Sequence, residues 1–279
     1  MNLRPTASLA ALALGLALSA CVHAPTAPPP GMADARFVLL GEVHDNPRHH
    51  TLRAQWLQAM LADGRPTRIV FEQMDATRDA ELQAARVATP TDSAAITRAG
   101  GLDAKAWRWP LHQPLVDAAL AGNAAITGGN LPRDTIRAVV REGTVPPALK
   151  PLLDAPGWTP DQQRATEADI AQGHCGALPD KQIAPMALAQ RVRDASLAQA
   201  MLAAPAGERV VLIAGNGHVR RDRGVPHYLR VAGVPDTAIV AVAFVEDEGD
   251  STPANAFDRL QATAREPRPD PCEAFKARG

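Results

Sequence analysis

Two motifs of the form Gly-x-x-His each follow directly on an apolar segment of the chain. The first reads GEVH at positions 41–44, and the second reads GNGH at positions 215–218. A glycine at such a point permits a sharp turn and the close approach of a ligand. A further carboxylate, Glu72, follows another apolar segment. Two histidines with one or two glutamates can bind a divalent metal ion and activate water.

This set of side chains predicts a site that binds a divalent metal ion and activates water. The alternative is that these polar residues only cap loops at strand ends, but two motifs in matched contexts favour a site. The hypothesis is a metal-dependent hydrolase with the catalytic residues Glu42, His44, Glu72 and His218, of which His44 and His218 ligate the divalent metal.

A basic segment begins within the second motif and reads GHVRRDRGVPHYLR at positions 217–230. Its four arginines and its single aspartate, Asp222, give a local charge of +3, from 4 − 1. Guanidinium groups bind carboxylates and phosphates well, so the segment suits an anionic ligand. A solvated loop without a ligand is the alternative.

The overall composition is that of a globular protein with a balanced charge. The 279 residues include 29 basic and 30 acidic side chains, and 46% of the residues are hydrophobic. A near-neutral chain with 4% aromatic residues lacks the basic surface and the stacking platforms on which nucleic-acid binding depends. The sequence also has no Walker A motif, no GxSxG elbow and no HExxH motif, which argues against nucleotide-dependent enzymes and serine hydrolases.

The first twenty residues predict an export signal rather than part of the fold. The apolar run 7–20 would form about 21 Å of helix, which is too short for a hydrocarbon core of about 30 Å. It ends in Leu-Ser-Ala-Cys, which is typical of a bacterial lipobox, so we expect Cys21 to carry the lipid. Val22 then indicates the outer membrane, facing the periplasm, and the proline-rich stretch 21–33 predicts a tether. An ordinary signal peptide is the alternative.

Two further cysteines, Cys175 and Cys272, remain after the lipobox residue. An exported protein meets an oxidising compartment, so we expect these two to form a disulfide. The sequence has no CxxC pair, which argues against a zinc ribbon or a thioredoxin-like site.

Short, continuous apolar runs predict buried strands of a parallel sheet that is covered on both faces. Helical patterns separate the runs; the first begins at Asn46-Pro47 and carries His49 and His50, neutral imidazoles that could ligate a metal or haem iron. The fold class is therefore α/β: a mainly parallel sheet flanked by helices, with a small all-helical subdomain inserted before the fourth strand. The expected strands are 36–40, 67–71, 124–127, 209–214 and 238–244, and the expected division is 1–20 signal peptide, 21–33 lipidated cysteine and tether, 34–130 with 205–279 α/β domain, and 131–204 helical subdomain.

Polar residues follow four of the five expected strands at their carboxyl ends. They include both Gly-x-x-His motifs, Glu72 and the Gly-Gly-Asn stretch 128–130. Because the carboxyl ends of parallel strands share one edge of the sheet, we expect these residues to border one ligand crevice.

Both Gly-x-x-His motifs, Glu72, the stretch 128–130 and the basic segment 217–230, with the residues around them, carry a resemblance to a known family. They resemble the ChaN-like haem-binding uptake lipoproteins, whose superfamily also includes the Tiki proteases, TraB proteins and erythromycin esterases. The resemblance implies a parallel sheet flanked by helices with a small helical domain. It implies an iron-regulated, lipid-anchored outer-membrane protein that binds haem for uptake, as a homodimer with a pair of haems between its subunits and with an outer-membrane receptor as partner. The matching segments are LLGEVHDNPRHH (39–50), VFEQM (70–74), GGNLPR (128–133), GHCGALPD (173–180), AQRVRDASLA (189–198) and AGNGHVRRDRGVPHYL (214–229).

In the family a tyrosine ligates the haem iron, and the resemblance thus implies Tyr228, the single tyrosine of the chain, as the ligand. Arg223 stands where some relatives have an aromatic residue before Gly-Val-Pro, so a histidine is the alternative ligand. Hydrolases of the superfamily place the Glu and His of their Gly-x-x-His motifs at the reaction centre, and hydrolysis therefore stays as the alternative to haem binding. In that case the resemblance implies Glu42 as the general base, with His44 or His218 ligating a metal ion or orienting water. The residues expected to bind haem are Tyr228, His227, His218, Arg220, Arg221 and Arg223.

Overall fold

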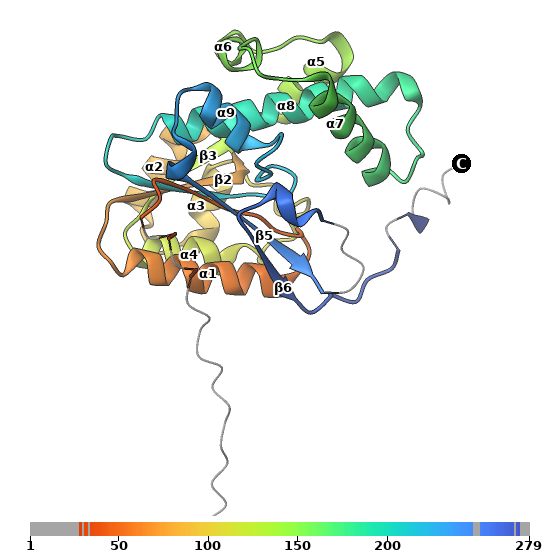
Figure 1. The fold of residues 1–279 in the computed structure, drawn as a ribbon. Coiled ribbons are helices and arrows are strands. Elements are labelled where there is room, and N and C mark those ends of the chain that lie inside the picture. Colours follow the sequence, from red (N-terminus) through yellow and green to blue (C-terminus); the bar gives the residue numbers. More distant parts are fainter. Residues whose placement is uncertain (1–27, 30, 33, 248–251, 271, 274–279) are drawn as a thin grey trace, which may run out of the picture.

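A six-stranded sheet in which every neighbouring pair is parallel forms the centre of the protein (Figure 1). The computed structural model describes residues 28–29, 31–32, 34–247, 252–270 and 272–273. The predicted signal peptide, Cys21 and most of the predicted tether lie outside them. The strands lie in the order β3-β2-β4-β1-β5-β6. Their bounds are β1 (Phe37–Leu40), β2 (Thr67–Asp75), β3 (Ala125–Asn130), β4 (Arg209–Ile213), β5 (Ile239–Glu246) and β6 (Arg259–Thr263).

The inner strands are buried on both faces, which explains their continuous apolar sequences. Alternate side chains of β1 join opposite cores, Phe37 and Leu39 on one face and Val38 and Leu40 on the other. Strand β4, which pairs with β1 from Phe37↔Val210 onwards, is divided between the cores in the same way. The predicted fold class, an α/β protein with a parallel sheet, is confirmed.

One face of the sheet carries the first group of helices. The Asn46 side chain caps the first of them by accepting hydrogen bonds from the amides of Arg48 and His49, at 2.9 and 3.4 Å, and Pro47 occupies its first position. Trp56 of this helix is buried against Phe244 of β5. The helices of this face, with the short 3-10 helix η1 (Ala76–Arg78), are α1 (Pro47–Leu61), α2 (Asp79–Ala88), α3 (Ser93–Ala99) and α4 (Gln113–Ala121).

The long helix α8 (Asp180–Leu202) lies on the other face, where it packs against β2, β3 and β4. Figure 1 shows α5, α6 and α7 beyond it, away from the sheet. The stretch 131–204 is thus helical or loop throughout, as the sequence predicts, but α8 belongs to the layer that covers the sheet. The remaining elements are α5 (Arg133–Glu142), η2 (Pro147–Leu149), α6 (Lys150–Leu153), α7 (Pro160–Gly173), α9 (Val225–Val231), η3 (Asp236–Ala238) and η4 (Ala254–Ala256).

The strand ends differ from the prediction in two respects. Strand β2 does not stop before Glu72 but continues to Asp75, with a shift of register against β3, and β3 runs on through Gly128 to Asn130. Gly128 is required there, because a side chain would meet the backbone of Asp75 at 2.4 Å. Five strands were expected, and the sixth, β6, was missed because its sequence RLQAT belongs to a partly exposed edge strand.

A disulfide joins Cys175, just beyond α7, to Cys272 near the end of the described chain, with the Cα atoms 5.5 Å apart. These are the two cysteines that the sequence analysis pairs. The bond ties the C-terminal segment to the connection between α7 and α8. Within the described residues no helix combines the length and the apolar character needed to span a bilayer.

Candidate functional site

A cavity of about 600 Å³ opens at the carboxyl edge of the sheet. Ligands of parallel α/β proteins bind in this position, and their sites commonly measure about 300–1,000 Å³. The lining comes from strand ends, from the loop before α4 and from the helices α5 and α8. It includes His44, Glu72, Gln73, Trp107, Asn130, Leu131, Arg133 and Arg193.

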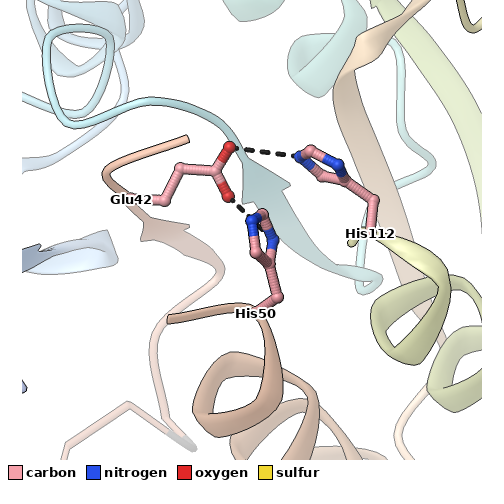
Figure 2. A group of neighbouring side chains, drawn as sticks. All are labelled: Glu42, His50 and His112. Atoms are coloured by element: carbon pink, nitrogen blue, oxygen red, sulfur yellow. Dashed lines mark hydrogen bonds and ion pairs between the residues drawn. The ribbon is translucent and has the colours of Figure 1, made fainter. Parts of the chain in front are cut away.

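Behind the cavity, a buried cluster surrounds the carboxylate of Glu42, which follows β1 and is 2% exposed. Its Oε1 atom lies 2.7 Å from Nδ1 of His44 and 3.2 Å from Nε2 of His112. Its Oε2 atom lies 3.3 Å from Nδ1 of His50, and Figure 2 shows His50 and His112 converging on the two oxygens. Arg53 of α1 also contacts Oε2. We call these five residues the Glu42 cluster.

The Glu42 cluster already holds a cation, the Arg53 guanidinium. Burial lowers the pKa of Arg53 to about 9, so the group stays charged at neutral pH. Burial, with the charges of neighbouring groups second, lowers the pKa of His50 and of His112 to about 3, so both imidazoles are neutral. Neutral imidazoles beside a carboxylate suit a metal ion, and the ligand atoms of Glu42, His50 and His112 lie within 4.8 Å of one another.

A divalent metal ion nevertheless does not fit this cluster. The Nη2 atom of Arg53 lies 3.0 Å from Nδ1 of His50 and also contacts Glu42, so the guanidinium lies between the atoms that would have to ligate the metal. The predicted metal ligands, His44 and His218, are not brought into one ligand group within the described part of the chain. His44 is paired with Glu42 instead, and His218 with Glu72 and Asp194.

His44 presents its imidazole to the cavity, and its side chain is 50% exposed. When neutral His44 donates its Nδ1 proton to Glu42, the lone pair of the ring lies on Nε2. The edge of the ring faces Trp107, with 5.1 Å between ring centroids. Gly215 is required beneath the ring, since a side chain there would lie 2.8 Å from Nε2. The two Gly-x-x-His motifs therefore pack directly against each other.

The histidine of the second motif, His218, lies between two carboxylates. Its Nδ1 atom is 2.6 Å from Asp194 of α8, and its Nε2 atom is 3.2 Å from Glu72 of β2. Burial alone would lower the pKa of His218, but the charges of Glu72 and Asp194 outweigh it and raise the pKa to about 10. Burial opposes ionisation of Glu72 as well, yet the imidazolium and a 2.7 Å hydrogen bond from the Gly215 amide hold its pKa well below the usual range.

The raised pKa of His218 predicts a pH-dependent stability. A group whose pKa rises from 6.5 to about 10 on folding stabilises the protein fully below pH 6.5 and loses that contribution as the pH approaches 10. We expect the free energy of unfolding to fall over this interval by up to about 1.4 kcal/mol per pH unit. Urea unfolding of the protein and of His218→Gln at several pH values measures this slope. A slope of equal size in His218→Gln would contradict the assignment.

The structure does not place the residues expected to ligate haem iron on the cavity. Tyr228 is 0% exposed, and its hydroxyl oxygen accepts a 3.2 Å hydrogen bond from Nε of Arg191, while its ring stacks on Trp158. Burial raises the pKa of the phenol, which disfavours the tyrosinate that iron would need. His227 also packs against Trp158 and is 7% exposed. A haem could reach either side chain only after this core had rearranged.

The basic segment is neutralised by aspartates, which the sequence analysis did not anticipate. Arg220 pairs with Asp222 at 2.8 Å, and Arg223 pairs with Asp222 and with Asp169 of α7 at 2.5 Å. Arg221 pairs with Asp236 and Asp258, each at 2.6 Å. The segment is therefore a network of ion pairs within the protein rather than a patch of open positive charge.

Four residues of the site carry no recognisable signal in the sequence. His112 lies in the loop before α4, Arg53 within α1, and Asp194 and Arg193 within α8. A buried Asp or Arg in a helix looks like any exposed helical residue until the packing of that helix is known. Only Asp194 and Arg193 fall in one of the segments that carry the family resemblance, AQRVRDASLA.

The fold and the site define a class of α/β proteins in which one Gly-x-x-His loop borders a ligand cavity at the carboxyl edge of a parallel sheet and a second Gly-x-x-His loop packs against the first. The family described as "Haem-binding uptake, Tiki superfamily, ChaN" matches residues 30–229, and the chain belongs to this family. The matched region includes the Glu42 cluster and His218. Comparison with curated proteins finds no match.

Solved structures with a similar fold include ChaN of Campylobacter jejuni, whose structure shows cofacial haem binding. That chain is 20% identical, with a TM-score of 0.65 over 78% of this chain and 85% of its own, and the likeness supports the fold. A mutant of the erythromycin esterase EreC is 15% identical, with a TM-score of 0.44 over 78% and 71% of the two chains. The type III effector HopBA1 is 13% identical, with a TM-score of 0.42 over 84% and 90%.

Proposed function

We propose that the protein binds haem in the cavity beside His44 and contributes to haem uptake. Membership of the haem-binding uptake family supports the ligand. One geometric observation supports the position: His44 lines the cavity with a half-exposed imidazole while Glu42 holds its other ring nitrogen. Histidines that ligate a metal commonly donate their second N–H to a carboxylate in this way, which fixes the ring and makes the ligating nitrogen more basic.

The cavity also offers the other groups that a haem needs. Trp107 and Leu131 supply apolar surface for the porphyrin, and Arg193 supplies a cation for one of its two carboxylates. Haem is the cargo in this proposal, so the protein's own residues bind and orient it and carry out no step on it. His218 is a poor ligand for the iron, because both of its nitrogens are occupied by carboxylates.

Titration of the purified protein with haemin tests the proposal. We expect a saturable change in the Soret band with one haem per chain, which corresponds to a pair of haems in a homodimer. Tyr228→Phe is the matched control and should give the same spectrum, since its hydroxyl is buried against Arg191. A haemin spectrum that never saturates would contradict haem binding.

Hydrolysis is the second candidate function, and the two histidine–carboxylate pairs beside one cavity favour it. The predicted role of Glu42 as general base does not fit, because both of its oxygens are engaged within the buried cluster. In this reaction His44 would take the proton from water through Nε2, and Glu42 would stabilise the resulting imidazolium. Hydrolysis would be favoured if the unmodified protein does not bind haem but has a hydrolytic activity, and if His44→Ala lacks that activity.

We also propose that lipid on Cys21 anchors the protein in the outer membrane, facing the periplasm, where a haem receptor would deliver the cargo. Cys21 lies outside the described residues, and the sequence of the lipobox supports this part of the proposal. Cys21→Ser should leave the protein unprocessed or move it from the membrane to the soluble fraction, because two or three acyl chains are what gives stable anchoring. Fractionation with and without detergent measures the change, and unchanged membrane association of a processed protein would contradict it.

A further inference from the structure

Arg193 of α8 places a cation on the cavity. Within the described part of the chain it forms no ion pair and no hydrogen bond, and its Nε atom is buried without a partner. The other arginine of the lining, Arg133, is 65% exposed and pairs with Asp103 at 3.0 Å. A guanidinium held partly buried without its hydrogen bonds is unfavourable unless a ligand supplies them.

We propose that Arg193 binds a carboxylate of the ligand and thereby sets the orientation of that ligand against His44. The assignment deepens the proposed function and rests on it: for haem, the group bound is a propionate. The planar guanidinium matches a carboxylate with two parallel hydrogen bonds, which fixes direction as well as position. Arg193 would thus be the specificity-determining residue of the cavity.

The acidic residues around the cavity leave this cation available. Glu72 is neutralised by the His218 imidazolium and by the Gly215 amide. Asp194, the neighbour of Arg193 in the helix, is directed at the other nitrogen of His218 at 2.6 Å. The charge of Arg193 acts on Asp194, but the direct contacts of Asp194 and Glu72 are with His218.

Two more acidic residues line the cavity on its outer side. Asp103 is held by Arg133. The side chain of Asp75 lies beside Gly101, and the arginine charges that act on it are those of Arg78 and Arg133. Among the residues that the structure describes, Arg193 is therefore the arginine of the lining that remains available to an anionic ligand.

A pair of ligands that differ only in charge tests the assignment. Haemin carries two free propionates, and haemin dimethyl ester carries none. We expect the unmodified protein to bind haemin about tenfold more tightly than the diester, as expected for loss of one charge-assisted pair. In Arg193→Met, haemin should bind about tenfold more weakly than in the unmodified protein, whereas the diester should bind equally well to both. The preference for the free acid should therefore disappear.

Arg137→Met is the matched control, because Arg137 is an exposed arginine of α5 that pairs with Asp134 and does not line the cavity. It should retain the preference for haemin. Arg193→Lys keeps the charge and should retain part of the preference for haemin over the diester. Such a result excludes a purely structural effect of the substitution. The lysine variant also serves as the test if Arg193→Met does not fold. An undiminished preference in Arg193→Met, or none in the unmodified protein, would overturn the assignment while leaving haem binding intact. If the unmodified protein binds neither porphyrin, the proposed function itself is wrong, and the assignment fails with it.

Discussion

Replacement of His44 by alanine is expected to weaken the binding of ferric haem by at least about a hundredfold, or ~2.7 kcal/mol. The reason is that His44 is the histidine on the cavity lining with an open ring nitrogen, and that lining contains no tyrosine, cysteine or methionine among the described residues. Loss of the imidazole removes the bond to iron and leaves only the porphyrin contacts and the arginines. Soret-band titrations of both proteins give the two dissociation constants.

Two further variants make the His44 prediction specific. Glu42→Gln keeps the size of the side chain but removes the charge that polarises His44, and loss of a group that holds a metal-ligating histidine typically weakens metal binding about 10–100-fold. His227→Ala is the control, because His227 packs against Trp158 away from the cavity lining, and it should bind haem normally. Free imidazole should restore the low-affinity spectrum of His44→Ala toward that of the unmodified protein. Unchanged haem affinity in His44→Ala would show that the iron is bound elsewhere.

Replacement of Arg53 by methionine is expected to lower the free energy of unfolding by about 3–5 kcal/mol. Arg53 is 0% exposed and contacts the buried Glu42 carboxylate, so its loss leaves an uncompensated charge in the interior. For a domain of this size the change corresponds to a melting temperature lower by about 10 °C. Thermal unfolding followed by circular dichroism measures it.

The matched controls for Arg53 separate burial of charge from loss of packing. Arg68→Met removes a partly exposed arginine whose partner is Glu208 at 3.1 Å, and it should cost less than about 1 kcal/mol. The double variant Arg53→Met with Glu42→Gln should recover part of the lost stability, because the stranded charge is gone. A double variant that is less stable than Arg53→Met alone would show that the ion pair is not the source of the effect.

The sheet was largely predictable from the sequence because its inner strands are buried on both faces. Continuous apolar runs such as 210–213 are typical of strands in a covered parallel sheet. Strand β6 lies at the edge of the sheet and lacks that signal. The carboxyl ends of β2 and β3 were also misjudged, since Glu72 and Asn130 are polar residues that continue a strand into the site. The predicted strands stop at these polar residues, because a polar residue after an apolar run usually marks a solvent-exposed loop. Here the polar residues stay within the strands and face the site.

The candidate site was predictable where the chemistry follows a strand directly. His44, Glu42, Glu72 and His218 come together as the two motifs indicate. The partners that tune them could not be predicted, since Arg53 and Asp194 come from helices whose rotation about their axes the sequence does not specify. The placement of Tyr228 differs for a similar reason.

Being the single tyrosine made Tyr228 the natural ligand, but the start of α9 turns it inward. The helix begins at Val225, so Tyr228 lies in its first turn with the ring in the core and the hydroxyl on Arg191. The arginines that precede the helix form ion pairs with aspartates of α7 and of the C-terminal half of the fold. The sequence around Tyr228 could not show that Arg191 contacts its hydroxyl, or that aspartates distant in the chain pair with the neighbouring arginines.

Pulsed EPR of the ferric haem complex, prepared from protein labelled with ¹⁵N-histidine, tests most directly whether His44 is the base that holds the iron. We expect a strong hyperfine coupling from one directly bound histidine nitrogen in the unmodified protein and its loss in His44→Ala. A ferric haem complex without any histidine coupling, or a coupling that persists unchanged in His44→Ala, would contradict this expectation.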